Sequence, residues 1–348
     1  MEGQKRWRNR PEGSNWGEFG SDDQIGRLNL LTPERTRRAV LEVREGRSFC
    51  LSLPLDYPGG SVLAAARWAP RLSATEWEGD VLMNYPFNRR GLDCTDVVSD
   101  DWVAMCLQYS TQWDSLAHAG ALFDADGDGL AEVCYYNGYR GGEDIPGPID
   151  YLRDNAPTGV GIGAHALGIE RMAETCVQGR GVMIDLEKHA GRGYRPVGYD
   201  ELMRILEADG VVVEEGDMVC LRTGYDKVLL GWNRSPPPDA RRHCVGLDGR
   251  DQRLRDWITN SGLAALISDN FAVEFIHDEH RRNEHGQAHL PLHEHCLFKL
   301  GIHLGEMFLL SDLADWLEEH RRNRFLLTAP PLRLPGAVGA PPAPVATV

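Results

Sequence analysis

Short apolar runs alternate with helical segments through the second half of the chain. Three runs have the length and apolar character of buried strands, at Gly181–Leu186, Met218–Gly224 and Leu263–Ser268. The segments Tyr199–Ala208 and Asp251–Asn260, which lie between them, are predicted to be helices. This alternation of strands and helices predicts one mixed α/β domain.

The N-terminal part gives fewer local signals. Thr32 is a natural N-cap and Pro33 follows it at the first helical position, so a helix is predicted over Glu34–Glu45. Phe49–Leu55 alternates apolar and polar side chains, which predicts a strand. Residues 1–14 are polar and basic and are predicted to be a flexible arm, so the single domain covers residues 15–348.

Four further segments complete the predicted layout. Residues 57–100 are rich in Gly, Pro, Arg and Trp, and we expect them to be irregular and to cover or line something. Val103–Gln108 is predicted to be a short buried strand. Glu306 is expected to open into a helix over Ser311–His320. The Pro-, Gly- and Ala-rich tail, Ala329–Val348, is expected to extend across a neighbour or another subunit.

Composition and charge exclude several classes of protein. The net charge of -15 argues against nucleic-acid binding, because phosphate contacts need a basic surface. No apolar run approaches the ~20 residues that span a bilayer, and the N-terminus lacks the apolar segment of a secretory signal. The eight cysteines include no Cys-x-x-Cys pair and are expected to be reduced thiols. We therefore expect a cytoplasmic protein that binds neither nucleic acid nor membrane.

Gln112, Asp114 and His118 place an amide, a carboxylate and an imidazole within seven residues. All three can coordinate a divalent cation, and the last two can also move protons. In a strand, Gln112 and Asp114 point to the same face. The motif therefore indicates a metal or acid–base site. The alternative is a strand-end turn whose polar groups satisfy backbone donors.

A second cluster lies downstream, between His277 and Glu306, and holds seven of the chain's twelve histidines. Such a density of imidazole suggests metal or proton chemistry. His277, His280 and His285 lie among charged residues and are expected in a solvated loop. His293 leads directly into an apolar segment and is expected to be a working residue. Glu306 follows an apolar strand and a glycine, which suits an inward-facing role, with helix capping as the alternative.

Asp124–Gly129 matches the start of an EF-hand calcium loop. The bidentate acid that such a loop needs at its twelfth position is Tyr135 here, and no predicted helix pair flanks the segment. We therefore do not expect calcium binding at this loop.

With these residues in view, the chain resembles the cyclase family that includes bacterial kynurenine formamidases and isatin hydrolases. That family carries His-x-Gly-Thr-His-x-Asp-x-Pro-x-His, and residues 108–118 fall on this pattern without a gap. The matching residues are Thr111, Asp114 and His118, and the departures are Gln108, Ser110, Gln112 and Leu116. His293 and Glu306 resemble the downstream half of the family's metal site. Segments from about residue 15 to 345 resemble the family's larger bacterial and fungal branch: Asn15-Trp16-Gly17, Tyr136–Tyr139, Arg222-Thr223-Gly224, Asp269–Glu274 and Ala329-Pro330-Pro331.

The resemblance implies a single α/β domain of the swivelling β/β/α type that assembles as a homodimer or homotetramer. It implies a zinc or manganese ion that activates water against a cyclic or N-formyl amide. Asp114 would be a metal ligand, His118 a ligand or the general base, and His293 and Glu306 would complete the site.

Gln108 and Gln112 stand where the family has histidines, and this should lower the metal affinity of the expected site. An amide oxygen is a weak neutral ligand compared with an imidazole nitrogen. We predict one Mn or Zn ion held by Gln112, Asp114, His118 and His293, or no metal and an Asp114–His118 acid–base pair. The predicted function is hydrolysis of a small-molecule cyclic amide, lactone or N-formyl amide, with Asp114, His118 and Glu306 as the catalytic residues. The alternatives are a metal-free cyclase or isomerase and a non-catalytic binding protein.

Five residues are predicted to contact the substrate. Trp113 and Phe271 would line an apolar pocket, and Arg222 would bind a substrate carboxylate or pair with a structural acid. Gln108 and Asn270 complete the predicted substrate-binding set.

Overall fold

Nine strands form one sheet within residues 5–277 and 288–348, which are the residues that the computed structural model describes. In spatial order these strands are β1 (Ser48–Cys50), β21 (Val345–Thr347), β19 (Arg324–Thr328), β13 (Gln178–Asp185), β15 (Met218–Arg222), β17 (Ala265–Ser268), β18 (His303–Glu306), β8 (Gln112–Asp114) and β20 (Gly339–Ala340). The central strands β13, β15, β17 and β18 are parallel, and the outer pairs are antiparallel. Their apolar runs are continuous because both faces of the sheet are covered.

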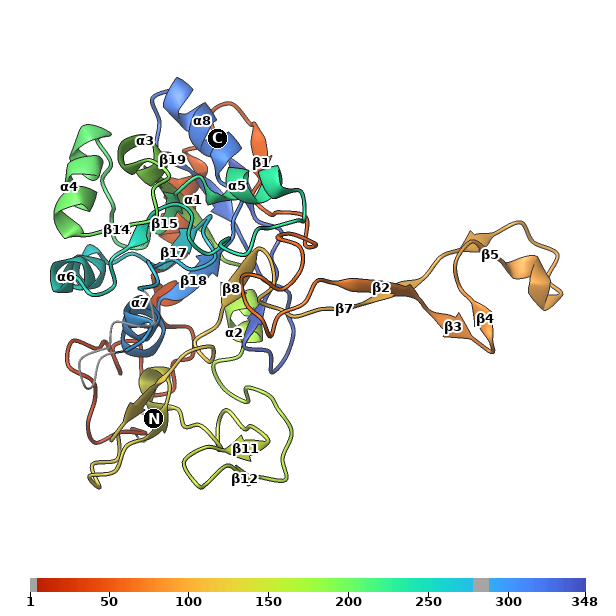
Figure 1. Ribbon diagram of the computed structural model, residues 1–348, viewed down its shortest axis with the longest axis horizontal. Helices are drawn as coiled ribbons and strands as arrows, with labels where there is room; N and C mark the ends of the chain where they lie inside the picture. The colour runs from red at the N-terminus through yellow and green to blue at the C-terminus, as the bar shows by residue number, and fades with distance from the viewer. Residues whose placement is uncertain (1–4, 278–287) are drawn as a thin grey trace.

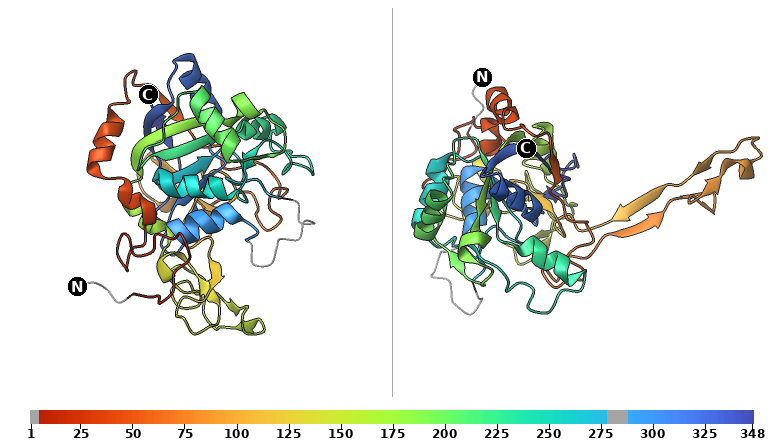
Figure 2. Two further views of the ribbon diagram at one scale, coloured as in Figure 1. Left: turned by 90° about the vertical axis from the view of Figure 1, so that its left-hand side faces the viewer. Right: turned by 90° about the horizontal axis from the view of Figure 1, so that it is seen from above.

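Side chains of the central strands alternate between two hydrophobic cores. Val182, Ile184 and Leu221 face a core with α4 (Tyr199–Ala208), α6 (Gln252–Ser261) and the π-helix η4 (Glu294–Leu300). Met183 and Cys220 face the opposite core, with α8 (Ser311–Glu319) and α2 (Ile169–Glu174). Figure 2 (left) looks onto the first of these helical layers. The functional cluster described below lies at the end of the sheet where β8 joins β18.

Several predicted elements are present with changed bounds. Thr32 caps α1 (Pro33–Val40) by accepting a hydrogen bond from the Arg35 main-chain N–H, but the helix ends at Val40 rather than Glu45. The predicted strand Phe49–Leu55 is reduced to β1. Glu306 ends β18 instead of opening a helix, and α8 begins only at Ser311.

A long two-stranded arm projects from the body at β2 (Arg71–Ala74) and β7 (Asp101–Ala104), as Figures 1 and 2 show. Shorter pairs continue it, formed by β3 (Glu76–Trp77) with β4 (Asp80–Val81) and by β5 (Tyr85–Pro86) with β6 (Val97–Val98). The prediction of an irregular covering segment over residues 57–100 is therefore wrong for this part. The prediction of a buried strand over Val103–Gln108 is also wrong, since Val103 is 50% exposed in β7. The apolar residues of this segment suggested burial, but the described chain leaves the ribbon uncovered.

The C-terminal tail extends across strands of its own sheet. Gly339 and Ala340 pair with β8, and β21 pairs with both β1 and β19. Gly339 is needed here because a Cβ atom would collide with the Gln108 side chain and the Trp113 carbonyl. The tail thus packs on a neighbour within the same chain, which was the first of the two expectations for it.

The remaining elements are short. They are η1 (Gly26–Leu30), η2 (Phe87–Arg90), β9 (Ala121–Phe123), β10 (Glu132–Cys134), η3 (Tyr136–Gly138), β11 (Ile149–Asp150), β12 (Ala156–Pro157), α3 (Leu186–Ala190), β14 (Pro196–Val197), α5 (Tyr225–Trp232), β16 (Gly246–Leu247) and α7 (Pro291–His293). The segment that follows residue 4 lies against the body, where Trp7 is buried edge-on to Trp16. Across the described ranges, the helices are too short or too polar to traverse a lipid bilayer.

Candidate metal centre

Two antiparallel neighbours in the sheet, β8 and β18, carry the first part of the site. Their register places Gln112 opposite Glu306, so the two side chains share a face, and Asp114 shares that face because it lies two residues along the strand. His293 reaches the same place from α7. One ligand atom from each of Asp114, His293 and Glu306 lies within 4.8 Å of the others, and all three residues are buried.

Several buried oxygens of this cluster lack hydrogen-bond partners in the described chain. They are Oε1 of Gln112, both carboxylate oxygens of Asp114 and Oε1 of Glu306. The Gln112 amide nitrogen donates to the other Glu306 oxygen at 2.9 Å, which fixes which end of the amide faces the cluster. Buried polar atoms are nearly always satisfied, so four acceptors without a hydrogen bond in one place need an explanation, even though the His293 Nε2 lies 3.3 Å from the Glu306 Oε1. A bound cation would satisfy all four.

A negative charge on the buried Asp114 carboxylate is unfavourable without a cation nearby. Burial raises the pKa of Asp114 to about 6, and the neighbouring Glu306 carboxylate adds to this increase, while His118 and His293 oppose it. Two carboxylates in a buried space repel each other unless cations lie between or beside them. A cation held between these carboxylates would offset their repulsion.

Glu274 orients His293. Its Oε1 lies 2.7 Å from the His293 Nδ1 and also accepts the His293 main-chain N–H, while its Oε2 accepts the Leu292 N–H. Because Nδ1 is engaged, the His293 Nε2 is left facing Glu306, 3.3 Å from Oε1. Despite burial, these two carboxylates raise the pKa of His293 well above its usual value. A carboxylate behind a histidine is a common support for a metal-ligating ring.

Glu274 was not predicted from the sequence to have a role at the site. It lies within the Asp269–Glu274 segment that carried part of the family resemblance, and that is the only sequence signal that could have drawn attention to it.

His118 lies at the open edge of the cluster. Its Nε2 is 3.8 Å from Asp114 Oδ1, and its ring centre is 6.4 Å from that of His293. Its side chain keeps 21% exposure, whereas that of Asp114 has none. Desolvation lowers the pKa of His118, although the Asp114 carboxylate opposes this. The lowered pKa favours the neutral ring, which can accept a proton.

Two of the predicted substrate-binding residues have other partners. Trp113 points to the opposite face of β8, where it packs edge-on to Phe308 and donates from its indole nitrogen to the Ala329 carbonyl. The Asn270 side chain donates to the Val245 carbonyl. Trp113 therefore does not face Asp114 and Glu306.

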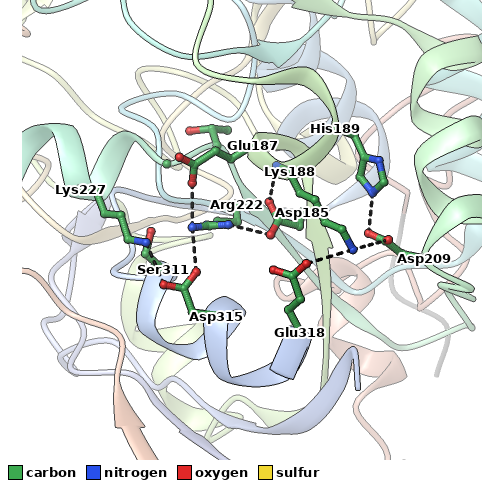
Figure 3. Close-up of polar contacts among 12 residues, drawn as sticks. Asp185, Glu187, Lys188, His189, Asp209, Arg222, Lys227, Ser311, Asp315 and Glu318 are labelled. Carbon is green, nitrogen blue, oxygen red and sulfur yellow. Dashed lines mark hydrogen bonds and ion pairs between the residues drawn. The ribbon is translucent and has the colours of Figure 1, made fainter. Parts of the chain in front are cut away.

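Arg222 belongs to a separate ion-pair network at the ends of β13 and β15 (Figure 3). It contacts Asp185 at 2.7 Å, Glu187 at 2.8 Å and Asp315 at 3.0 Å. Of the two expectations for this residue, the structure shows the pairing with structural acids.

Gln108 and Phe271 do lie near the cluster. Both line a small pocket at the root of the arm, together with Arg67, which was not among the predicted site residues. The Gln108 side chain lies against Gly339, which pairs with Asp114.

The other predicted histidines lie away from the cluster or outside the described residues. His277 contacts Asp248, and His295 contacts Thr259 and the Arg255 carbonyl. His280 and His285 fall among the residues that are not described.

A second group of carboxylates, Asp124, Asp126 and Asp128, could also approach a metal. It is largely exposed, and its oxygens already accept main-chain N–H groups of their own turn. It therefore lacks the buried, unpartnered acceptors of the Asp114 cluster.

Comparison with known proteins places the chain among similar sequences and structures. The Cyclase family model, described as "Putative cyclase", matches residues 51–275. A crystal structure of a novel cyclase has a TM-score of 0.71 at 29% identity, covering 96% of this chain and 97% of that one. Isatin hydrolase A from Labrenzia aggregata, bound to benzyl benzoate, has a TM-score of 0.53 at 12% identity over 86% and 93%. Isatin hydrolase A from Ralstonia solanacearum has 0.54 at 11% identity over 86% and 91%. No curated protein gives a significant sequence match.

Proposed function

This chain belongs to the cyclase family, and from that membership we propose that it is a metal-dependent hydrolase of a cyclic amide, a lactone or an N-formyl amide. The observation that carries the proposal is the set of four buried, unpartnered oxygens beside His293. The isatin hydrolases, which share the fold at low identity, support hydrolysis as the reaction class.

The donor atoms fit one divalent cation. Asp114 and Glu306 offer carboxylate oxygens, His293 offers Nε2, and Gln112 offers its amide oxygen. With a single imidazole among oxygen donors, this set favours a harder cation such as Mn²⁺ over zinc. When bound, such a cation supplies positive charge that polarises a carbonyl group and makes a water molecule more acidic.

His118 is the residue that we expect to move the proton. Burial lowers its pKa and so favours the neutral ring, its side chain keeps 21% exposure, and the Asp114 carboxylate 3.8 Å away stabilises its protonated form. It would take a proton from water as the water oxygen bonds to the carbonyl carbon. It would then return that proton to the leaving nitrogen or oxygen as the C–N or C–O bond breaks. An N-formyl amide would give formic acid and an amine, whereas a cyclic amide or a lactone would open to one molecule that carries both the carboxylic acid and the amine or alcohol.

The proposal predicts that the protein, purified without chelators, holds about one equivalent of divalent metal and hydrolyses at least one such substrate. Elemental analysis gives the metal content, and a panel of isatin, an N-formyl arylamine and an aryl lactone gives the activity. Chelation should remove the activity and Mn²⁺ should restore it. A protein without metal that gains nothing from zinc or manganese would contradict the proposal. Residual turnover would then support metal-free acid–base chemistry, and substrate binding without turnover would support a binding protein.

We also propose that two copies of the chain associate through the arm. The nine large apolar side chains that the arm leaves exposed in the described structure are Trp68, Leu72, Trp77, Val81, Met83, Leu92, Val97, Trp102 and Val103. A two-stranded ribbon is marginally stable alone in water, and a cluster of exposed apolar residues is typical of an interface. The arm points away from the body of its own chain (Figure 1), so its apolar side chains need a partner molecule to cover them. A second copy of the chain is the partner that is always present. A two-fold arrangement would give both arms the same contacts.

Shortening the arm tests this proposal. Arg71 and Ala104 are direct partners in the ribbon, so an Asn-Gly turn can replace residues 72–103 between them. The full-length chain should be a dimer or tetramer by light scattering coupled to gel filtration, and the shortened chain should be a monomer that still binds metal. A full-length monomer, or a shortened chain of unchanged assembly size, would be evidence against this role of the arm.

A further inference from the structure

The π-helix η4 connects two of the proposed metal ligands, His293 and Glu306. It follows His293 directly, and Gly301 caps its C-terminus two residues before β18 begins. A π-helix takes one more residue into each hydrogen-bonded turn than an α-helix does, and π-turns are rare and often lie at functional sites. The form of η4 therefore affects how His293 and Glu306 are placed relative to each other.

Asn15 and Trp16, from the N-terminal part of the chain, cap the end of η4. The last carbonyls of a helix have no partner within the helix itself. In η4 the Phe298 carbonyl accepts a hydrogen bond from the Trp16 indole nitrogen at 2.8 Å. The Lys299 carbonyl accepts the Asn15 main-chain N–H at 3.2 Å, and the Leu300 carbonyl accepts the Asn15 amide nitrogen at 2.9 Å. Two adjacent residues thus satisfy three consecutive carbonyls.

Both ends of η4 are also held by other contacts. At its start, Glu274 binds the main chain and the ring of His293. At its end, the Gly301 carbonyl accepts the Arg27 main-chain N–H at 2.8 Å. Gly26 lies so close to Gly301 that a Cβ atom on either residue would collide with the main chain of the other. The number of residues per turn in η4 has to fit the space between these two ends.

The hydrogen bond from Trp16 opposes an alternative pattern for the same helix. In an α-helix the Phe298 carbonyl would accept the main-chain N–H of Ile302. In η4 that N–H donates instead to the Cys296 carbonyl, at 2.8 Å. Trp16 is 1% exposed and packs edge-on to Phe298, so its indole occupies the Phe298 carbonyl in a buried place. Without it the carbonyl would be left unsatisfied, and the α-helical pattern would restore a partner.

We propose that Asn15 and Trp16 are positioning residues for the metal centre. By occupying the last carbonyls of η4 they keep the helix from the α-helical pattern, and so they hold His293 at the distance from Glu306 at which both can bind one cation. The use of this spacing for a cation rests on the proposed function, whereas the positioning of His293 does not. A cap that only stabilised the fold would leave His293 unchanged in any variant that still folds.

Trp16→Phe tests the inference, because it removes the indole N–H and keeps an aromatic ring in place. In the full-length, histidine-labelled protein after chelation, the nuclear magnetic resonance signal of the His293 ring, assigned with His293→Gln, should shift. Titration with Mn²⁺ should show an affinity about tenfold lower, as expected when support for a metal ligand is lost. Asn15→Ala removes the donor to the Leu300 carbonyl and should change both readouts in the same direction.

Trp7→Phe is the matched control. Trp7 packs edge-on to Trp16 with 5.7 Å between the ring centres, and in the described part of the chain it has no hydrogen bond to η4. The control therefore makes the same change in the same aromatic cluster and leaves the cap in place. Its His293 signal and its Mn²⁺ affinity should match those of the unmodified protein. Circular dichroism and the thermal midpoint establish that each variant is folded.

An unchanged His293 signal in folded Trp16→Phe and Asn15→Ala proteins, or an equal shift in Trp7→Phe, would overturn the inference. An unchanged Mn²⁺ affinity in these two variants, when the unmodified protein binds the ion, would also overturn it. An unmodified protein that binds no metal would remove the proposed function, and the His293 signal would still decide the positioning. A metal-dependent hydrolase in which neither variant affects His293 would do the reverse.

Discussion

Replacing Asp114 with asparagine is expected to abolish cation binding at the cluster while leaving the fold intact. The substitution removes the carboxylate of the cluster whose two buried oxygens both lack a hydrogen bond in the described chain, and it keeps the shape of the side chain. Loss of a supporting group near a metal costs 10–100-fold in affinity, so loss of this ligand should cost about 100-fold or more. Metal content after dialysis and titration with Mn²⁺ measure the effect, and turnover should fall with it.

The same substitution should leave the thermal midpoint of the metal-free protein unchanged or raise it. Burial and the Glu306 carboxylate both disfavour a charge on Asp114, so a neutral amide removes a repulsion. A structural carboxylate would show the opposite, because its loss would leave buried donors without partners.

Asp126→Asn is the matched control for Asp114→Asn. It makes the same carboxylate-to-amide change in the second group of carboxylates that could approach a metal, Asp124, Asp126 and Asp128. That group is largely exposed. Metal content should not change in this variant. If Asp126→Asn removed the metal and Asp114→Asn did not, the assignment of the metal centre would be wrong.

The central strands and helices could be predicted from the sequence because their signals are local. β13, β15 and β17, with α4 and α6 between them, lie within a few residues of their predicted positions. The predicted fold class, one α/β domain of the swivelling β/β/α type, is confirmed by the match to the cyclase family and its solved structures.

The assembly of the metal centre could not be predicted from local patterns. Asp114 meets Glu306 only because β8 pairs with β18, and that pairing joins distant parts of the chain. The family resemblance suggested that the two halves meet, but it did not identify Glu274, whose role exists only through its contact with His293.

The arm and the tail show the limit of composition as evidence. Both are rich in residues that break regular structure, and both nevertheless form paired strands. Strand pairing depends on a partner elsewhere in the chain or beyond it, and residue type alone does not identify that partner.

Gln112 is the position where this chain departs most informatively from the pattern of its family. Its amide nitrogen holds one oxygen of Glu306, and its amide oxygen is left as a neutral ligand toward the cluster. An imidazole nitrogen is a much stronger donor to zinc than an amide oxygen, whereas Mn²⁺ gains less from the exchange. The glutamine should therefore lower the zinc affinity of the centre relative to its manganese affinity.

Gln112→His should reverse this preference. We expect the ratio of zinc to manganese affinity to rise on the order of tenfold or more, as measured by competition with a chromophoric chelator for zinc and by electron paramagnetic resonance for Mn²⁺. Gln178→His makes the same substitution in β13, where the glutamine contacts Thr328, and should leave the ratio unchanged. An equal gain for both ions would contradict the predicted preference, whereas no change in either affinity in folded Gln112→His protein would show that residue 112 is not a ligand. The cation would then be held by Asp114, His293 and Glu306 without it.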